Sequence, residues 1–290
     1  MVGKLQIIWR CRGREVVCGQ KTLIMGILNA TPDSFSDGGK FLAVETAVAR
    51  GLEMVAEGAD IIDIGGESTR PGANPVQALE EIARTVPVIE KLRKKTGVLI
   101  SIDTRKAEVA RAAITAGADI INDVSALADP GMAMVAAETG AGLVLMHMLG
   151  RPETMQNDPQ YADVILEVRN FLEECTAFAM ERGVAPEQIA LDPGIGFGKT
   201  DAHNLALLNN IPALAASGRP VLIGASRKGF IGRLLGGGPD KRLAGSLAVA
   251  TFSVLRGAHI LRVHDVKDSC DAAKLVDKLR AQGTQDGLVT

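Results

Sequence analysis

The feature that most constrains this sequence is a series of short apolar runs, each ending at a residue suited to chemistry. Eight such runs are separated by segments long enough to form helices, which is the alternation expected of strand and helix units. The runs lead into Asn29, Asp63, Asp103, Asn122, His147, Asp192, Ser226 and His264. A barrel of such units gathers the carboxyl ends of its strands at one mouth, where barrel enzymes have their active sites. The pattern therefore predicts an α/β enzyme with a (β/α)8 TIM barrel.

An internal repeat supports the barrel. Residues 58–63 read Gly-Ala-Asp-Ile-Ile-Asp, residues 117–122 read Gly-Ala-Asp-Ile-Ile-Asn, and residues 257–261 form a looser copy. Each copy follows a helix-like segment, so each glycine is expected to end a helix and lead into a buried strand. A doubly wound open sheet would also alternate in this way. Eight similar runs with little sequence left over favour closure.

Residues 5–19 precede the barrel and are strand-like on both sides of a turn at Arg12-Gly13-Arg14. We expect them to form a β-hairpin that covers the bottom of the barrel, opposite the mouth. Two helices are predicted over 76–95 and 161–182, where apolar residues recur at three- and four-residue steps.

The chain is accordingly expected to form one domain, 1–290, with the hairpin in 1–20 and the barrel over 23–282.

Composition argues against several classes of function. The 290 residues are 47% hydrophobic, which is ample for one large core, and the net charge of −2 gives no general attraction to nucleic acid or membrane. Only 3% of the residues are aromatic, which argues against a base-stacking surface. No apolar run approaches the roughly 20 residues of a membrane-spanning helix. The four cysteines have no metal-ligand or redox spacing, so we expect reduced thiols and a cytoplasmic location.

Three connections that follow strands, 29–40, 65–75 and 226–239, are too polar and glycine-rich to be simple links. Long loops at the catalytic face usually act as lids or substrate clamps. The alternative is a disordered surface loop.

The expected mouth has two electrostatic halves. Asp103, Asn122 and Asp192 offer acceptors and one amide to a flat heterocycle that carries several N–H donors. A second group of side chains is suited to phosphate and consists of Arg70, Lys228, Arg262 and His264. A ligand with a donor-rich ring at one end and phosphate at the other would satisfy both halves.

Some of these residues have alternative interpretations. Asp63 and Asp123 are equally well explained as helix caps or loop anchors. His147 is more readily a packed, hydrogen-bonded histidine than a base, because no acidic partner is evident. Lys228 would suit a Schiff base, but the sequence around it reads as a loop entering a helix, from which a lysine reaches back over a bound ring. The glycines of 194–199 lack the spacing of a nucleotide-binding loop.

With these residues in place, the sequence resembles the dihydropteroate synthase family from about Leu23 onward. The matching segments are Met25–Gly39, Asp63–Gly72, Ser101–Thr104, Ile121–Asp123, Met146–Met148, Asp192–Lys199, Ser226–Lys228 and Arg262–Asp265. Eight ordered matches at strand ends are far more specific than any single glycine-rich stretch.

The resemblance implies condensation of 7,8-dihydropterin-6-ylmethyl diphosphate with 4-aminobenzoate to give 7,8-dihydropteroate and diphosphate, a step of folate biosynthesis that sulfonamides target. It implies catalytic roles for Asn29, Asp103, Lys228 and His264, and a Mg²⁺ ion held by Asn29. The implied pterin diphosphate site comprises Thr69, Asp103, Asn122, Met146, Asp192, Lys228, Arg262, Val263 and His264. The implied 4-aminobenzoate site comprises Phe35, Thr69, Arg70, Pro71, Phe197, Lys228 and Gly229.

The resemblance has one departure and implies one assembly. Many family members have serine after the lysine, contacting the aminobenzoate carboxylate, where this chain has Gly229. The family further implies a homodimer, for which apolar residues of the later helices are the candidate interface: Val249, Phe252, Leu255, Leu275 and Leu279.

Two other functions compete with this one. A pterin methyltransferase would use a similar barrel but has no need of a diphosphate site. Arg262 and His264 indicate such a site and therefore argue against this class. A catalytically silent paralogue would keep the fold alone.

Overall fold

The structure is a computed structural model that describes residues 6–30, 40–68, 75–152, 154–238 and 241–285. Its strands are β1 (Ile7–Cys11), β2 (Arg14–Cys18), β3 (Leu23–Asn29), β4 (Ile61–Gly65), β5 (Leu99–Asp103), β6 (Ile120–Asp123), β7 (Gly142–Met146), β8 (Ile189–Asp192), β9 (Leu222–Ile223) and β10 (Ile260–Val263). Its α-helices are α1 (Lys40–Glu57), α2 (Ala78–Lys95), α3 (Ala107–Ala116), α4 (Met132–Thr139), α5 (Val164–Glu181), α6 (Asp201–Asn209), α7 (Ile211–Ala215), α8 (Gly229–Leu235), α9 (Leu243–Leu255) and α10 (Val266–Gln285). The short 3₁₀ helix η2 (Pro186–Gln188) precedes β8.

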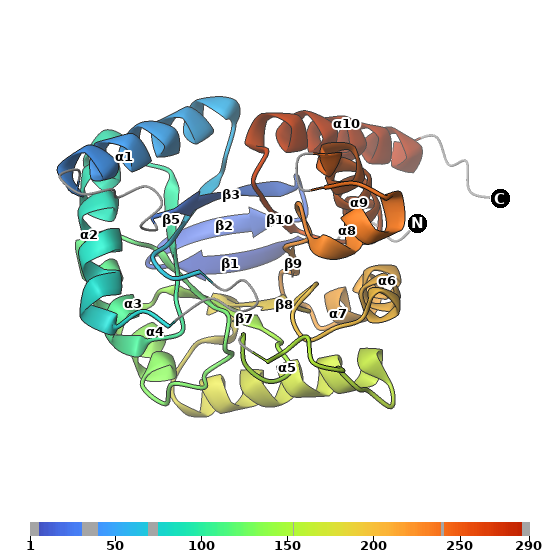
Figure 1. Cartoon of the computed structure of the whole chain (residues 1–290), viewed down its shortest axis with the longest axis horizontal. Helices are drawn as coiled ribbons and strands as arrows, with labels where there is room; N and C mark the ends of the chain where they lie inside the picture. Colours follow the sequence, from blue (N-terminus) through green and yellow to red (C-terminus); the bar gives the residue numbers. More distant parts are fainter. Residues whose placement is uncertain (1–5, 31–39, 69–74, 153, 239–240, 286–290) are drawn as a thin grey trace.

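The eight strands β3 to β10 form one parallel sheet in which neighbours follow chain order, with β10 paired to both β3 and β9. A single parallel bridge between Leu191 and Val221 joins β8 to β9 and closes the ring. The helices surround the strands in Figure 1. This circular order confirms the (β/α)8 barrel and rules out the doubly wound alternative.

The strands are buried along most of their length because the barrel interior lies on one side and the helices lie on the other. Every residue of β4, β5 and β7 is buried. Strands of this kind carry near-continuous apolar runs, since both faces are covered. The charged residues within these runs are therefore exceptions, and each has a structural or chemical reason.

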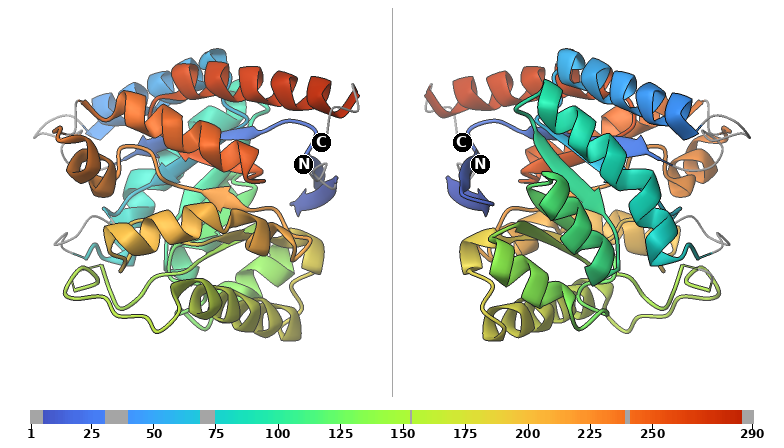
Figure 2. Two further views of the ribbon diagram at one scale, coloured as in Figure 1. Left: turned by 90° about the vertical axis from the view of Figure 1, so that its right-hand side faces the viewer. Right: turned by 90° about the vertical axis from the view of Figure 1, so that its left-hand side faces the viewer.

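The hairpin β1–β2 covers the bottom of the barrel, as predicted. Arg12 and Gly13 both have positive φ, 52° and 77°, the pair required by the tight turn that matches strand twist. Trp9 is fully buried, and its indole N–H donates to the carbonyl of Gln188 at 2.7 Å. Figure 2 shows the hairpin at one end of the barrel and the segment after β7 at the other. The hairpin therefore covers the end of the barrel opposite the carboxyl ends of the strands (Figure 2).

The helical predictions are correct in kind and differ at the ends. The helix predicted over 76–95 begins at Ala78, and the one predicted over 161–182 spans Val164–Glu181 because Asp163 caps it with two backbone N–H bonds. The polar stretch 226–239 contains helix α8, which begins at Gly229, in agreement with the prediction that the sequence around Lys228 is a loop entering a helix. All four cysteines are free thiols. Within the described ranges, no helix is long and apolar enough to cross a membrane.

Candidate active site

The carboxyl ends of the barrel strands bring four side chains from distant parts of the chain into direct contact. Arg262 of β10 donates through Nε to Asp63 Oδ2 at 2.6 Å and through Nη2 to Asp103 Oδ2 at 2.5 Å. Asn122 of β6 donates to the same Asp63 oxygen at 3.2 Å. One guanidinium is therefore shared by two buried carboxylates at the centre of the mouth. Such a cluster is retained at the cost of desolvating three charges.

Asp103 is the most perturbed carboxylate of this cluster. Burial raises its pKa to about 7; the charges of Asp63 and Glu81 add to this effect, and Arg262 opposes it. Its second oxygen, Oδ1, is buried and has no hydrogen-bond partner among the described residues. A buried acceptor without a donor costs roughly 1–3 kcal/mol. Asp103 is therefore ready to accept a donor or to balance a positive charge.

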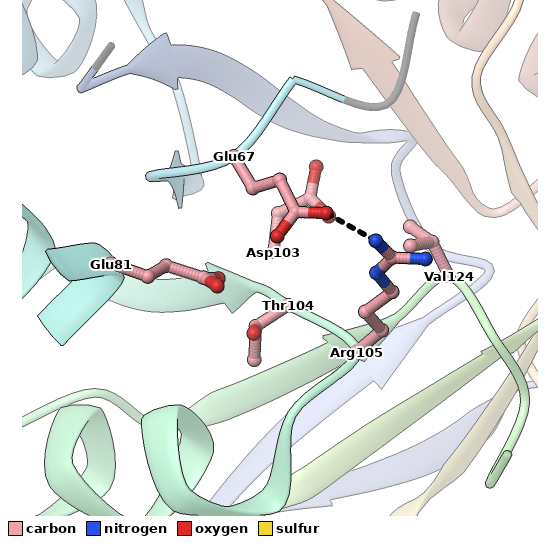
Figure 3. Close-up of a pocket in the computed structure, with 6 residues that line it drawn as sticks. All are labelled: Glu67, Glu81, Asp103, Thr104, Arg105 and Val124. Atoms are coloured by element: carbon pink, nitrogen blue, oxygen red, sulfur yellow. Dashed lines mark hydrogen bonds and ion pairs between the residues drawn. The ribbon is translucent and has the colours of Figure 1, made fainter. Parts of the chain in front are cut away.

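A small cavity that Asp103 lines has a volume of about 10 Å³, close to the space of one water molecule. Figure 3 shows its lining side chains, with the Arg105 guanidinium bonded to Glu67. Glu81 is fully buried, and one of its oxygens, Oε1, has no hydrogen-bond partner in the described part of the chain. Lys106 bonds Glu67 and also contacts Glu81 at 2.5 Å. These ion pairs tie the end of β4 to the segment that follows Asp103.

Asp192 and Lys228 form the opposite wall of the mouth. Asp192 ends β8 and accepts from the backbone N–H of Gly194 through Oδ1 at 2.7 Å. Burial raises the pKa of Asp192 to about 6, and burial together with Arg262 lowers the pKa of Lys228 to about 8. Asp192 and Lys228 attract each other electrostatically, so both carry charge near neutral pH.

Lys228 is directed inward by the turn before α8. Arg227 has a positive φ of 56°, which is uncommon for a residue with a side chain. Asp265 binds its guanidinium, and the Ser246 hydroxyl accepts from its backbone N–H at 2.9 Å. The Lys228 ammonium lies 3.7 Å from the centre of the Phe197 ring. This cation–π contact joins the two segments that the resemblance assigns to 4-aminobenzoate.

The loop that carries Phe197 is fixed by a buried lysine. Lys199 is 1% exposed, and its ammonium contacts the Phe197 carbonyl at 2.9 Å and His147 Nδ1 at 2.9 Å. Burial and the neighbouring ammonium lower the pKa of His147 to about 3, so the imidazole is neutral. A side chain at Gly194, whose φ is +67°, would place its Cβ 1.8 Å from the His147 carbonyl oxygen. Only glycine allows these two loops to approach so closely.

Asn29 and His264 lie apart from the central cluster and face a common cavity of about 310 Å³ beside α1. Ser226 orients His264 by accepting from its backbone N–H at 3.2 Å and by lying 3.2 Å from Nδ1. Burial and the charge of Arg262 lower the pKa of His264 to about 4. His264 is therefore a neutral hydrogen-bonding group near pH 7.

The side chains around this cavity suit a Mg²⁺ ion that has few protein ligands. Among the residues that the structure describes, no three His, Cys, Asp or Glu side chains gather in a way that would hold a metal by themselves. The Asn29 amide supplies a hard oxygen at the open edge of the mouth. Mg²⁺ typically keeps several waters and is shared between one or two protein oxygens and substrate phosphates. A single protein ligand beside a diphosphate site fits this pattern.

The structure places the other predicted residues as follows. Met146 is buried in an apolar cluster with Val124, Met155 and Phe197 at the carboxyl ends of β6 to β8, and Val263 belongs to the main core. Asp123 is a loop anchor, because its carboxylate accepts from Ser125 and from the backbone of Leu127. His147 is a packed histidine, as expected. Four predicted residues lie outside the described part of the chain: Phe35, Thr69, Arg70 and Pro71.

Three residues of the site were underrated by the sequence. The sequence allows Asp63 to be a cap or a site residue, and the structure shows it in the site, where Arg262 and Asn122 donate to its carboxylate. Lys199 and Glu81 were not identified, because lysine and glutamate are almost never fully buried and nothing in the local pattern marks the exception. Asp63 positions Arg262 and Asn122, Lys199 positions Phe197, and Glu81 acts on Asp103 through its charge.

Comparisons with known proteins agree with this geometry. Residues 25–264 match the family described as pterin binding enzymes, so fold and site define a pterin-binding barrel enzyme. A dihydropteroate synthase of Synechocystis sp. is 49% identical over 263 residues, which cover 90% of this chain and 91% of the relative. The chain belongs to the dihydropteroate synthase family, the transferases of folate biosynthesis that sulfonamides target.

Solved structures extend the match. The dihydropteroate synthase of Xanthomonas albilineans with 4-aminobenzoic acid has a TM-score of 0.89 and 46% identity, covering 96% of this chain and 99% of its own. The Yersinia pestis dihydropteroate synthase with a sulfonamide drug has a TM-score of 0.89 and 42% identity, covering 95% and 100%.

Proposed function

We propose that the mouth condenses 7,8-dihydropterin-6-ylmethyl diphosphate with 4-aminobenzoate, and that the bond to diphosphate breaks before the new C–N bond has largely formed. The observation that carries this proposal is the central cluster, in which half-buried Arg262 is bound by the buried carboxylates of Asp63 and Asp103. Such a site is built to stabilise separated charge. A departing diphosphate and a cationic pterin are the two charges that this reaction develops.

The pterin ring is assigned to the wall formed by Asn122, Asp192 and Lys228. One oxygen of Asp192 is already used by the Gly194 N–H, so the other is the acceptor for the amino-pyrimidinone edge. Lys228 is suited to the ring carbonyl, and Met146 contributes to the apolar cluster that it forms with Val124, Met155 and Phe197. A role in binding the pterin explains why the Asp192 carboxylate is buried although no cation among the described residues bonds to it directly.

Asp103 is assigned to the positive charge on the ring. Ionised Asp103 would lower the energy of a cationic pterin, and its unpartnered Oδ1 is available to a ring N–H. Arg262 keeps the carboxylate oriented through Oδ2. Preorganised charges of this kind act without reorganisation during the reaction.

The diphosphate is assigned to the cavity that Asn29 and His264 line. Neutral His264 would donate a hydrogen bond to the leaving group. A Mg²⁺ ion held by Asn29 would supply the charge that favours diphosphate departure. The third hydrogen-bonding nitrogen of Arg262, Nη1, is directed to neither carboxylate and is available to the same anion.

4-Aminobenzoate is assigned to the surface formed by Phe197, Lys228 and Gly229. The Xanthomonas albilineans relative has been solved with 4-aminobenzoic acid, which supports this ligand class. Phe35, Thr69, Arg70 and Pro71 remain predicted contributors to this site. A sulfonamide is expected to compete at the same surface.

A single turnover assay separates the candidate functions. Pterin diphosphate, 4-aminobenzoate and Mg²⁺ should yield dihydropteroate and diphosphate in equal amounts, with inhibition by a sulfonamide that 4-aminobenzoate relieves. A pterin methyltransferase would instead transfer a methyl group to a corrinoid partner. A silent paralogue would bind pterin without forming product. Binding of pterin diphosphate without any turnover would overturn the proposed function.

We further propose a homodimer formed through α9 and α10. Phe252, Leu255, Leu275 and Leu279 are all exposed on these two packed helices, whereas Val249 is half-buried against the core and contributes less. Exposed apolar side chains gathered on adjacent helices are typical of subunit interfaces. Light scattering should give twice the mass of the chain at micromolar concentration. The double variant Leu275→Lys, Leu279→Lys should give a monomer.

A further inference from the structure

Arg233 lies over the backbone of Gly229, the first residue of α8 and the neighbour of Lys228. A Cβ at Gly229 would be 3.0 Å from Arg233 Nη1 and 3.9 Å from Cζ. The arginine side chain therefore runs back along the helix toward its first turn, as long side chains on helices commonly do. The missing side chain at position 229 leaves the space in which the guanidinium lies.

Asp201 holds this guanidinium by one edge. Arg233 Nε lies 3.1 and 3.0 Å from the two Asp201 oxygens, and Nη2 lies 2.5 Å from Oδ1. Asp201 is the first residue of α6 and follows the loop that carries Phe197. The ion pair thus connects the two segments on either side of the Lys228–Phe197 contact.

The opposite edge of the guanidinium has donors to spare. Both hydrogens of Nη1 and one of Nη2 are unused in the described residues, and the Arg233 side chain is 61% exposed. An arginine held side-on by one carboxylate can bind a second carboxylate end-on through Nη1 and Nη2. The second anion would lie beside Gly229.

We propose that Arg233 binds the carboxylate of 4-aminobenzoate and sets the preference of this enzyme for an anionic amine. The inference rests on the proposed function, because that function places the aromatic amine on Phe197, Lys228 and Gly229. The diphosphate is not the partner: Asn29 and His264 line a separate cavity beside α1, whereas Arg233 is bound to Asp201 after the Phe197 loop. Arg233 thereby supplies a carboxylate contact at a position where Gly229 has no side chain to offer one.

The test compares 4-aminobenzoate with 4-aminobenzamide, which has the same ring and amine but no charge. In Arg233→Gln, KM for 4-aminobenzoate should rise about tenfold, the loss expected for an exposed charge-assisted contact. The KM for 4-aminobenzamide, the KM for pterin diphosphate and kcat should stay within about twofold of wild type. Arg111→Gln is the matched control, because Arg111 forms a similarly exposed pair with Glu138 at 2.8 Å; it should change none of these values.

The outcomes separate the two proposals. An unchanged ratio of the two KM values in Arg233→Gln overturns the role of Arg233 even when turnover is normal. Failure of wild-type enzyme to turn over either amine would instead count against the proposed function, and calorimetric binding of 4-aminobenzoate to wild type and variant then decides on Arg233. If Arg233→Gln does not fold, Arg233→Lys keeps the charge without the planar fork and should show about a threefold rise.

Discussion

The two ends of this barrel differ in how their buried polar groups are satisfied. At the bottom, fully buried Trp9 lies in an apolar layer and satisfies its one polar group with the Gln188 carbonyl. At the mouth, Glu81 is fully buried and Asp103 is 8% exposed, yet each keeps one oxygen for which the described part of the chain offers no partner. Native proteins rarely leave such atoms unpaired. Trp9 at the bottom is therefore satisfied within the protein, whereas these two carboxylates at the mouth each keep an acceptor to offer to a ligand.

The two ends also differ in what their residues contribute. The apolar layer beneath β1 and β2 lowers the free energy of the folded state by burial. The mouth gathers two carboxylates around Arg262, which stabilises the fold little, because desolvation offsets the attraction. Substitutions at the bottom should therefore change stability without changing activity, and substitutions at the mouth should do the reverse.

The largest effect is expected from Trp9→Ala. The loss of a buried indole should lower the free energy of unfolding by about 3–5 kcal/mol. Well below the melting temperature, kcat/KM should stay within about twofold of wild type. Denaturant unfolding and steady-state kinetics on the same sample measure both. A large fall in kcat/KM of the folded variant would break the division between the two ends.

Asp192→Asn tests the mouth. The Gly194 N–H needs an acceptor, so the amide oxygen should turn toward it and present its NH₂ group to the donor edge of the pterin. Pterin binding should weaken by roughly 2–4 kcal/mol. Calorimetry measures the change. Asp123→Asn is the control, because Asp123 is a buried anchor of the neighbouring loop. This variant should be less stable than wild type but should bind pterin with the same affinity.

Lys199→Met tests a residue that shares features of both ends of the barrel. Lys199 is as buried as the residues at the bottom, but it supports the Phe197 loop at the mouth. Its loss leaves the Phe197 carbonyl and His147 Nδ1 without their donor. Binding of 4-aminobenzoate should weaken by about 1–2 kcal/mol while pterin affinity is kept. Separate KM values for the two substrates measure this split. Equal changes in both would indicate general loosening of the fold.

The smallest effect is a shift in pH dependence. The pKa of Asp103 is raised to about 7 by burial and by the negative charges of Asp63 and Glu81. The ionised form supports the cationic pterin, so kcat/KM should fall as the pH decreases through about 7. Glu81→Gln removes one negative charge, which lowers the Asp103 pKa and moves the inflection to lower pH. An inflection that stays in place would show that Glu81 does not act on Asp103.

The sequence was most informative where a local pattern determines the outcome. The ends of the apolar runs located Asp103, Asn122 and Asp192, since the carboxyl end of a barrel strand necessarily faces the mouth. The arrangement around them depends on contacts between residues far apart in the chain. Arg262 reaches Asp63 across 199 positions, and Lys199 reaches His147 across 52. No local spacing signals such pairs, so their roles emerged only from the fold.

The barrel is a ring with a seam. Between β8 and β9 the parallel pairing is reduced to the Leu191–Val221 bridge, and β9 itself has only two residues. Amide hydrogens of Leu222 and Ile223 should therefore exchange with deuterated water sooner than those of β4 or β5. Asp192 stands at the end of one side of this seam, and the segment to Lys228 continues from the other. A pterin bound to both residues would hold the two sides of the seam together. It should therefore slow amide hydrogen exchange at Leu222 and Ile223, although it contacts neither residue.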